Sequence, residues 1–389
     1  ADRTNSGRVE LEYNKDVDEA LPGTSTTAIA LTREVKPLPP ALDVNVPSNY
    51  RFMFTSMLQR AEALEAHLLA MQGHISETYD LPKAAPVGVA SQDDVVCYGR
   101  ICCDSEGKIN PASVLLEGSR RASNGARVPV DLKEARRFTL FPGQVVAVRG
   151  INSTGTKLVA KEVCEGVPAP QLTSTPAEMR NLAGAGPTRV WAAAGPFCPH
   201  EDLEYMPLKE LLAEAAGADD VPDVVVLMGP FVDAGHPACK SGEMEMTDPE
   251  SGHPYPVSFE ELFSERVEQI LCRYLLEPAL RNTQVVLVPS VEDAHLFPVF
   301  PQAPMPAFSF KLLDDAEREA VSRRVTMMSN PCTFTVGKTV ISINTNDILK
   351  HLAGDVAARH PAPAPNLFER LCRALLQQRS HYPLFPPPR

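Results

Sequence analysis

The feature that most constrains the fold is a set of short, continuously apolar runs in the second half of the chain, such as Val224-Val225-Val226-Leu227-Met228. A strand with one face in water alternates apolar and polar residues, whereas a strand covered on both faces is apolar throughout. The similar runs, and the helical stretches that separate or follow them, cover residues 190–194, 208–216, 259–276, 285–288, 339–343 and 367–378. Buried strands that alternate with helices predict an α/β domain whose sheet is covered on both faces.

The segment before this domain carries a different pattern. Between residues 94 and 163, five short runs rich in β-branched residues are separated by Gly, Asn, Asp and Ser. Five strands in about 75 residues fit an OB-type barrel better than a sandwich, which needs about seven. The interval 131–137 has room for the helix that such barrels often carry between two strands. The predicted fold class is therefore mixed, with an OB-type β-barrel followed by an α/β domain.

Two segments, 1–50 and 171–187, are predicted linkers, because they are too polar and Pro-rich to offset the entropy of ordering them. Between the first linker and the barrel, which we place at 85–170, segment 51–84 has apolar residues at three- and four-residue steps. This spacing predicts a helix with one apolar stripe. The stripe contains Phe54, Met57, Leu58, Ala61, Leu64, Leu68, Met71 and Ile75. It either packs on its own domain, which we favour, or binds a partner. The α/β domain is expected over 188–389.

The composition argues against some classes of protein. A formal net charge of −12 argues against a general nucleic-acid coat. The nine Cys residues include no C-x-x-C pair, so we expect reduced thiols in a nuclear or cytosolic protein rather than a structural zinc site. No glycine-rich loop has the spacing that a phosphate-binding turn requires, and we predict no cofactor.

The loops after the predicted strands are where ligands of α/β sheets collect. Three of these loops begin at Gly195, Gly229 and Pro289. A binuclear phosphoesterase needs Asp-x-His, Gly-Asp-x-x-Asp and Gly-Asn-His there, because carboxylates and imidazoles must hold two cations. In this chain the first loop has no Asp, and Ser290 replaces Gly or Asn in the third. In the second loop Pro230, which has no donor atom, replaces the bridging carboxylate.

The pattern therefore predicts that the domain has no metal site and no catalytic residue. The degenerate loops keep Gly229 and Pro230 together with four polar residues for which we expect loop-capping or surface roles: Asp233, His236, Asp293 and His295. An active metallophosphodiesterase is the least favoured alternative. A barrel that binds single-stranded DNA is a second one, but residues 85–170 hold eleven Lys or Arg against nine Asp or Glu, a weak excess.

Several blocks of sequence occur in the same order as in a known family. They include Leu140-Phe141-Pro142-Gly143-Gln144-Val145-Val146, Gly229-Pro230-Phe231-Val232-Asp233-Ala234, Asp293-Ala294-His295 and Gln378-Arg379-Ser380-His381-Tyr382-Pro383. In these blocks, and over about residues 50–389, the chain resembles the B subunits of the eukaryotic replicative DNA polymerases. The Phe-Pro-Gly-Gln-Val-Val block favours the polymerase alpha–primase branch.

The resemblance implies an OB-type barrel followed by a calcineurin-like phosphoesterase-type sandwich domain that is catalytically inactive. In the family this domain continues beyond the position of Arg389, so we expect it to be incomplete at its C-terminus here.

The implied function is that of a non-catalytic accessory subunit of DNA polymerase alpha–primase in the nucleus. Such a subunit would bind the C-terminal region of the polymerase alpha catalytic subunit, reach the primase subunits through the complex, and support primer synthesis. Contact with DNA would be indirect or weak, and no membrane is involved. The sequence does not identify the partner-binding residues.

Overall fold

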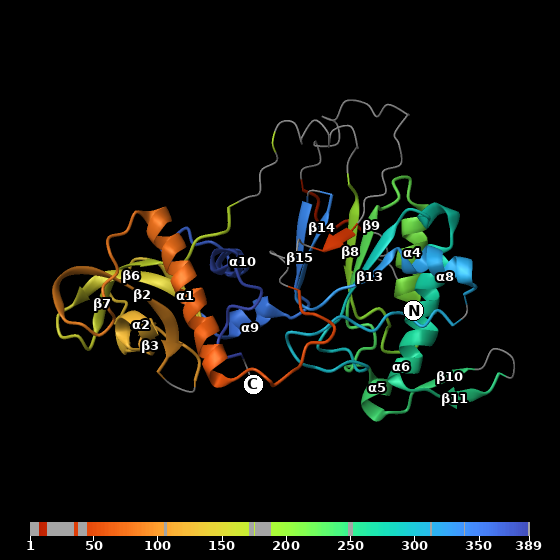
Figure 1. The fold of residues 1–389 in the computed structure, drawn as a ribbon, viewed down its shortest axis with the longest axis horizontal. Coiled ribbons are helices and arrows are strands. Elements are labelled where there is room, and N and C mark those ends of the chain that lie inside the picture. Colours follow the sequence, from red (N-terminus) through yellow and green to blue (C-terminus); the bar gives the residue numbers. More distant parts are fainter. Residues whose placement is uncertain are drawn as a thin grey trace.

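The structure, a computed structural model, has two lobes, one built around a β-barrel and one around a parallel sheet (Figure 1). It describes residues 8–13, 35–37, 45–104, 107–170, 175, 188–247, 252–311, 313–337 and 339–387. The predicted linker 171–187 lies outside these ranges apart from Thr175. Within the described ranges every helix is too short or too polar to cross a membrane. The predicted fold class, a barrel followed by an α/β domain, is confirmed.

Five strands close the barrel in the order β2-β3-β4-β7-β6. They are β2 (Ser91–Cys103), β3 (Val114–Gly118), β4 (Arg127–Asp131), β6 (Val145–Asn152) and β7 (Leu158–Cys164). Every second residue of β3 and β4 is buried, and side chains such as Leu116, Val128 and Leu158 fill the interior. A Cβ on Gly150 would lie 1.9 Å from the Val159 carbonyl oxygen, so β6 needs glycine where its pairing with β7 is irregular.

The interval 131–137 is not helical, and that prediction was wrong. The Arg359 guanidinium donates hydrogen bonds to backbone carbonyl oxygens of three residues, at 2.8, 3.3 and 3.2 Å: Leu132, Lys133 and Ala135. Carbonyl groups in a helix accept from N–H groups of their own segment, whereas Arg359 reaches these from far along the chain. A short helix, α2 (Arg120–Ser123), occurs instead between β3 and β4.

The long helix α1 (Met57–Tyr79) begins at a capping box formed by Ser56 and Gln59. Along its C-terminal half Leu68, Met71 and Ile75 are buried against β2 and β6, so this half packs on its own domain as we favoured. Its N-terminal end does not pack in this way. Three predicted members of the stripe, Phe54, Met57 and Leu58, are exposed, because the barrel surface does not extend beneath them.

The α/β lobe contains a parallel sheet in the order β13-β12-β9-β8. Its strands are β8 (Val190–Ala194), β9 (Val224–Met228), β12 (Gln284–Val288) and β13 (Val325–Met327). The segments between them form α4 (Met206–Gly217), α5 (Pro237–Ser241), the hairpin β10 (Glu245–Thr247) and β11 (Pro254–Pro256), α6 (Phe259–Leu262), the π-helix η2 (Phe263–Glu268), α7 (Gln269–Leu275), the 3₁₀ turn η3 (Pro278–Leu280) and α8 (Asp315–Ser322).

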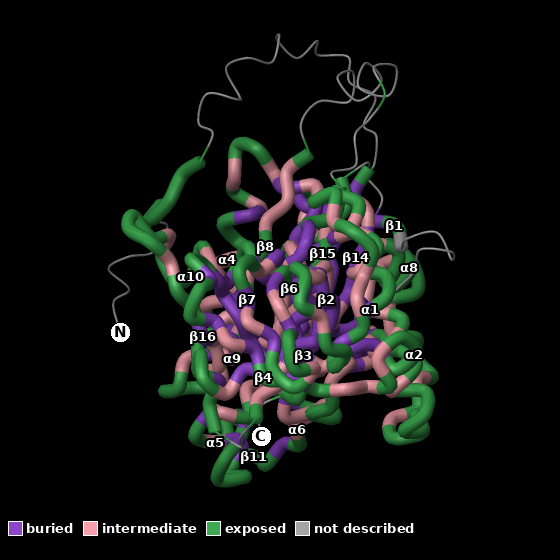
Figure 2. Tube along the Cα trace, turned by 90° about the vertical axis from the view of Figure 1, so that its left-hand side faces the viewer, coloured by how far each residue is buried: buried purple, intermediate pink, exposed green. Residues whose placement is uncertain are grey.

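Successive residues of the central strands face opposite layers, which explains their continuously apolar sequences. Val225 and Leu227 of β9 pack in the cluster that contains the helices, whereas Val224 and Val226 pack in the cluster that contains Phe334 of a second sheet. Buried residues accordingly follow the strands, and exposed residues follow the outer helices and turns (Figure 2). The carboxyl ends of β8, β9 and β12 therefore meet at one edge, between two covered faces.

The second sheet is antiparallel and has the order β1-β14-β15. Strand β14 (Cys332–Val336) lies between β15 (Thr339–Ile343) and β1 (Val35–Pro37). Strand β1 belongs to the predicted linker 1–50, so that prediction was wrong for these three residues. The sheet supplies the backbone partners that a polar segment lacks by itself, and the Val35 N–H also donates to Gln284 at 2.8 Å.

The last part of the chain crosses back to the barrel. It forms α9 (Ile348–Gly354), β16 (Ala357–Arg359) and α10 (Leu367–Gln378), and β16 pairs with β5 (Phe138–Leu140). The buried Gln378 side chain accepts from the Val145 N–H at 2.8 Å and donates to the Val145 and Glu165 carbonyl oxygens. The segment was expected within the α/β domain, but these pairings hold it on the barrel.

Candidate functional site

The loops that the sequence singles out meet at the carboxyl edge of the parallel sheet. The Gly195 N–H donates to the Met228 carbonyl oxygen and the Gly229 N–H donates to the Val288 carbonyl oxygen, both at 2.8 Å. Each loop is therefore tied to the neighbouring strand by the first residue after its own strand. The peptide bond before Pro230 is cis.

Asp293 lies at the centre of this edge, and its carboxylate points into the protein. One oxygen accepts from the Phe231 and Val232 N–H groups, and the other accepts from the Ser290 N–H at 2.8 Å. Burial raises the pKa of Asp293 to about 6, against the opposing effect of these hydrogen bonds. The carboxylate thus joins the second loop to the third, and a backbone bridge between Asp233 and Asp293 completes the junction.

Gly229 is required by this arrangement. A Cβ at that position would lie 2.4 Å from Asp293 Oδ2 and 2.9 Å from the Ser290 nitrogen. Pro230, next in sequence, places no carboxylate at the edge. Gly229 and Pro230, at the position of a catalytic loop, thus allow the second and third loops to approach each other closely.

Asp233 is more accessible, with 14% of its side chain exposed, and it stabilises a local turn. Its Oδ1 atom accepts from the Gly235 N–H at 2.7 Å. Its Oδ2 atom lies 4.0 Å from Nε2 of His200, an exposed residue that sequence reasoning missed. His200 follows the first strand by six positions, whereas the Asp-x-His pattern comes directly after its strand.

His236 uses both ring nitrogens within the protein. Its Nδ1 atom accepts from the Ala238 N–H at 3.2 Å, which caps α5, and Nε2 donates to the Pro199 carbonyl oxygen at 3.0 Å. This assignment makes the ring neutral.

His295 is buried, with 6% of its side chain exposed, so a surface role does not describe it. Its ring stacks on Phe263 at 4.5 Å, and within the described ranges neither ring nitrogen has a hydrogen-bond partner. Burial lowers the pKa of His295 to about 4, so the ring is neutral at pH 7. The charge of Glu260 opposes this shift. The Asp293 carboxylate lies 3.8 Å from the ring and is itself held by three N–H groups.

Two buried amides, which the sequence pattern did not single out, close the rim of this edge. Gln302 and Asn330 exchange backbone hydrogen bonds at 2.7 and 2.9 Å. The Gln302 side chain donates to the Ser290 carbonyl oxygen at 3.0 Å, and the Asn330 side chain accepts from the Thr345 N–H at 3.2 Å. These bonds connect the third loop to the second sheet.

The residues present do not fit a centre of two cations. The Asp293 oxygens and both His236 nitrogens are engaged with the backbone, which leaves Asp233 and His200 near the surface. Each cation would need about four or more ligands. Across the part of the chain that the structure describes, no group of three or more His, Cys, Asp or Glu could hold a metal ion.

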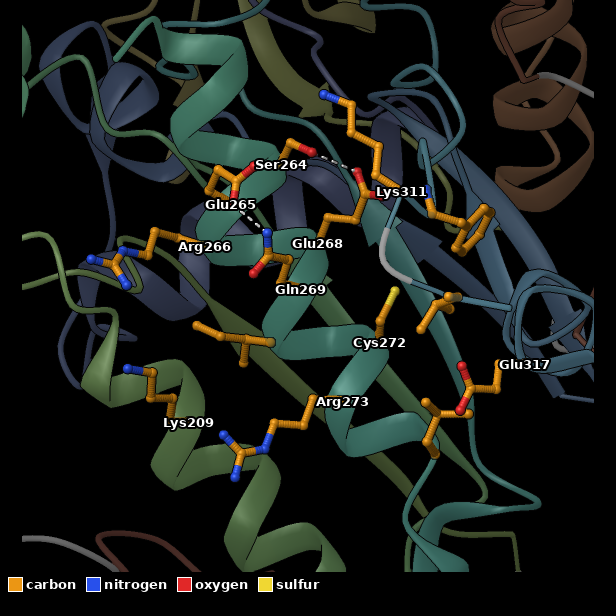
Figure 3. Close-up of a pocket in the computed structure, with 14 residues that line it drawn as sticks. Lys209, Ser264, Glu265, Arg266, Glu268, Gln269, Cys272, Arg273, Lys311 and Glu317 are labelled. Carbon is orange, nitrogen blue, oxygen red and sulfur yellow. Dashed lines mark hydrogen bonds between the residues drawn. The ribbon is translucent and has the colours of Figure 1, made fainter. Parts of the chain in front are cut away.

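A hollow of about 510 Å³ lies elsewhere, on the helical side of the lobe (Figure 3). The buried Glu268 carboxylate on η2 accepts from the Ser264 and Ser309 hydroxyls and from the Phe310 N–H, so it fixes the segment before α8. Burial raises the pKa of the Cys272 thiol to about 12, which makes it a poor nucleophile. The polar groups described here stabilise the helical layer.

Two family models match the chain. The model for the B subunit of DNA polymerase alpha/epsilon matches residues 190–389, and the model for the OB domain of the DNA polymerase alpha B subunit matches residues 61–166. The second match includes most of α1, in agreement with the packing of that helix on the barrel.

Three curated relatives are named as the B subunit of DNA polymerase alpha. The Rattus norvegicus protein is 33% identical over 340 residues, which cover 87% of this chain and 52% of that protein. The Mus musculus protein is 31% identical over 388 residues (99% and 58%), and the Schizosaccharomyces pombe protein is 31% identical over 347 residues (87% and 56%). The chain spans about half the length of these relatives.

Among solved structures, a full-length MCM homolog from Methanopyrus kandleri matches 42% of this chain and 33% of its own at 17% identity. Its TM-score of 0.15 carries no information on the fold. The first family model, in contrast, covers more than half of the residues, including the strand-end loops and the segment that returns to the barrel. The chain therefore belongs to the family of DNA polymerase alpha/epsilon B subunits.

Proposed function

We propose that this chain acts as a non-catalytic accessory subunit of DNA polymerase alpha–primase in the nucleus. In this role it binds the C-terminal region of the polymerase alpha catalytic subunit, reaches the primase subunits through that complex, and supports primer synthesis. The observation that carries the proposal is the match to relatives named as the B subunit of DNA polymerase alpha, which extends over both lobes.

The strand-end loops support the non-catalytic part of the proposal. A hydrolase needs carboxylates turned toward its substrate, and the Asp293 carboxylate is turned toward the backbone of Phe231 and Ser290. Pro230 occupies the position of a bridging ligand. The carboxyl edge of the parallel sheet then serves as a rigid junction that supports a binding surface.

The partner is tested by co-expressing the chain with the C-terminal region of a polymerase alpha catalytic subunit. We expect a one-to-one complex on size-exclusion chromatography with light scattering. The matching region of a polymerase epsilon catalytic subunit is the control, since the family model covers both enzymes. A chain that stays free beside the alpha region at about 10 μM of each would overturn the assignment.

The non-catalytic part has its own test. The purified chain is incubated with Mn²⁺ and bis-p-nitrophenyl phosphate, and bound metal is measured by mass spectrometry. We expect neither stoichiometric metal nor hydrolysis above the buffer rate. Hydrolysis that disappears in Asp233→Ala would show instead that the strand-end edge is an active phosphodiesterase.

A further inference from the structure

Two adjoining cavities lie where the barrel meets α10. One, of about 480 Å³, is lined by Arg136, Arg137 and Arg149, and the other, of about 650 Å³, is lined by Arg137, Arg370 and Arg373. They share Arg137, Val163 and Pro361 as lining residues, so they adjoin, and we treat them together as one groove. We call it the arginine groove and define it by these five arginines. It is separate from the strand-end loops and from the hollow on the helical side.

Most of these arginines make no direct polar contact within the described part of the protein. Within the described residues, Arg136, Arg137, Arg149 and Arg370 make no ion pair and no side-chain hydrogen bond, and Nε of Arg370 is buried without a partner. A guanidinium has five N–H donors, so such a site offers many hydrogen bonds to a ligand. Arg373 differs, because it pairs with Glu369 at 3.1 Å.

The acidic residues around the groove do not cancel this charge. Asp94 pairs with Lys161 at 2.6 Å, and Glu369 pairs with Arg373. Glu165 lines the groove, accepts from the Thr139 N–H at 2.6 Å and interacts electrostatically with Arg137, Arg373 and Arg370. Glu134 and Glu162 face Arg136, Arg137 and Arg149. The six basic residues of the two cavities outnumber the five acidic ones by one, so the lining has a small positive excess, although the chain carries a formal net charge of −12.

The fold holds these charges together from distant parts of the sequence. Arg359 fixes the loop that carries Arg136 and Arg137, through carbonyl groups of that loop. Gln378 anchors the C-terminal end of α10 on the barrel, and Arg370 and Arg373 of the same helix line the groove. Burial, and then the charges of Arg370, Arg137 and Arg373, lower the pKa of the adjacent His360. Converging like charges cost stability, and an anionic ligand would offset that cost.

Other lining groups favour a nucleic acid over an acidic peptide. Tyr79, which is 44% exposed, and His360 lie among the arginines, and aromatic rings and guanidinium planes both stack on unpaired bases. The outer face of β3 and β4, the usual binding face of an OB barrel, instead carries an internal pair between Glu117 and Arg127. We propose that the arginine groove binds the phosphate backbone of single-stranded nucleic acid, with Tyr79 stacking on a base.

The test uses the full chain and a fluorescein-labelled oligo(dT) of about 20 nucleotides, followed by fluorescence anisotropy between 50 and 200 mM salt. We expect saturable binding whose log–log salt slope is about −0.7 for each phosphate contact, and thus about −3 for four contacts. Arg137→Glu with Arg149→Glu should weaken binding at least about tenfold, and Tyr79→Ala about tenfold, near the lower end of the range for one stacked base.

The matched control is Arg318→Glu on α8 with Arg323→Glu at its C-cap. It changes the net charge equally, but it lies on the other lobe and outside the groove. Equal weakening in this control, or no binding at 50 mM salt, would overturn the proposal. Displacement of oligo(dT) by polyglutamate at an equal concentration of negative charge would also overturn it, because the groove would then bind acidic peptides.

Circular dichroism melts establish that each variant is folded. If Arg137→Glu with Arg149→Glu unfolds the chain, Arg137→Gln with Arg149→Gln is measured in its place. The proposal then requires a salt slope closer to zero in this variant than in wild type. No polymerase subunit is present in these measurements, so their outcome is independent of the proposed function.

Discussion

Asp293 and Arg370 are both charged side chains that the fold turns toward its interior, and they differ in what meets them there. Three backbone N–H groups meet the Asp293 carboxylate, whereas Nε of Arg370 has no partner among the described residues. The strand-end edge uses its polar atoms to hold the protein together, whereas most arginines of the arginine groove have no direct partner among the described residues. Residue type alone would have placed the functional site at the strand-end edge. The remaining hydrogen-bonding capacity supports the proposed site at the groove.

The largest effect should come from Asp293→Ala. The change leaves three buried N–H groups without an acceptor, so we expect a loss of about 3–5 kcal/mol in the free energy of unfolding. Urea denaturation followed by circular dichroism measures it. Asp233→Ala is the control and should cost no more than about 1 kcal/mol, since that carboxylate accepts from one local N–H. Similar losses in the two variants would remove the distinction between a structural carboxylate and a peripheral one.

Gln378→Ala should come next. The Gln378 side chain is fully buried and makes three hydrogen bonds to Val145 and Glu165. Its removal leaves those groups unpaired and opens a cavity, so we expect a loss of about 2–4 kcal/mol by the same measurement.

The neighbouring Gln377 provides a control on the same helix. Its side chain lines the groove, and its Oε1 atom has no partner among the described residues. Gln377→Ala should therefore change stability by less than about 0.5 kcal/mol. A cost as large as that of Gln378→Ala would mean that the groove face of α10 also holds the protein together.

His295→Phe should stabilise the protein. The substitution keeps an aromatic ring against Phe263 and removes two buried nitrogens without partners, which should gain about 1 kcal/mol at pH 7.

The pH dependence of the same variant has a definite sign. In wild type the unfolded chain protonates His295 below its ordinary pKa of 6.5, while the folded chain does not until about pH 4. Stability is therefore lost as the pH falls from 6.5 to 4, by about 2 kcal/mol at pH 5. His295→Phe removes this loss, so its advantage over wild type should be larger at pH 5 than at pH 7. An advantage that shrinks at pH 5 would mean that the ring is charged in the folded state.

Local sequence patterns were enough to predict the features that depend on residues close together in the chain. The apolar runs at 190–194 and 224–228 are strands, and the stretch 367–378 is a helix, because each pattern is repeated within a few residues. The same reasoning identified the barrel. In the strand-end loops it found Asp293 and His295, but residue spacing could not show that the first faces three N–H groups or that the second stacks on Phe263.

The remaining features depend on distant contacts. Arg359 donates to the Leu132 carbonyl oxygen from more than 220 positions away, and Val35–Pro37 forms a strand by pairing with β14. The arginine groove likewise joins residues near 137 to residues near 370. A composition count over 85–170 gave a weak positive excess because it omitted α10 and included charges that are paired elsewhere on the barrel.

The smallest effect on stability should come from Arg149→Ala. Charged residues of the strand-end edge should matter for stability, whereas those of the arginine groove should not. Arg149 projects from the outer face of β6 and its side chain, among the described residues, makes no hydrogen bond or ion pair, so its removal should change the free energy of unfolding by less than about 0.5 kcal/mol. Oligo(dT) affinity should nevertheless fall, with a salt slope closer to zero by about 0.7. Lys157→Ala, which breaks a 2.7 Å pair with Asp131 outside the groove, is the control and should leave the slope unchanged. A stability loss of about 2 kcal/mol or more in Arg149→Ala would show that the groove, like the strand-end edge, uses its charges to hold the fold.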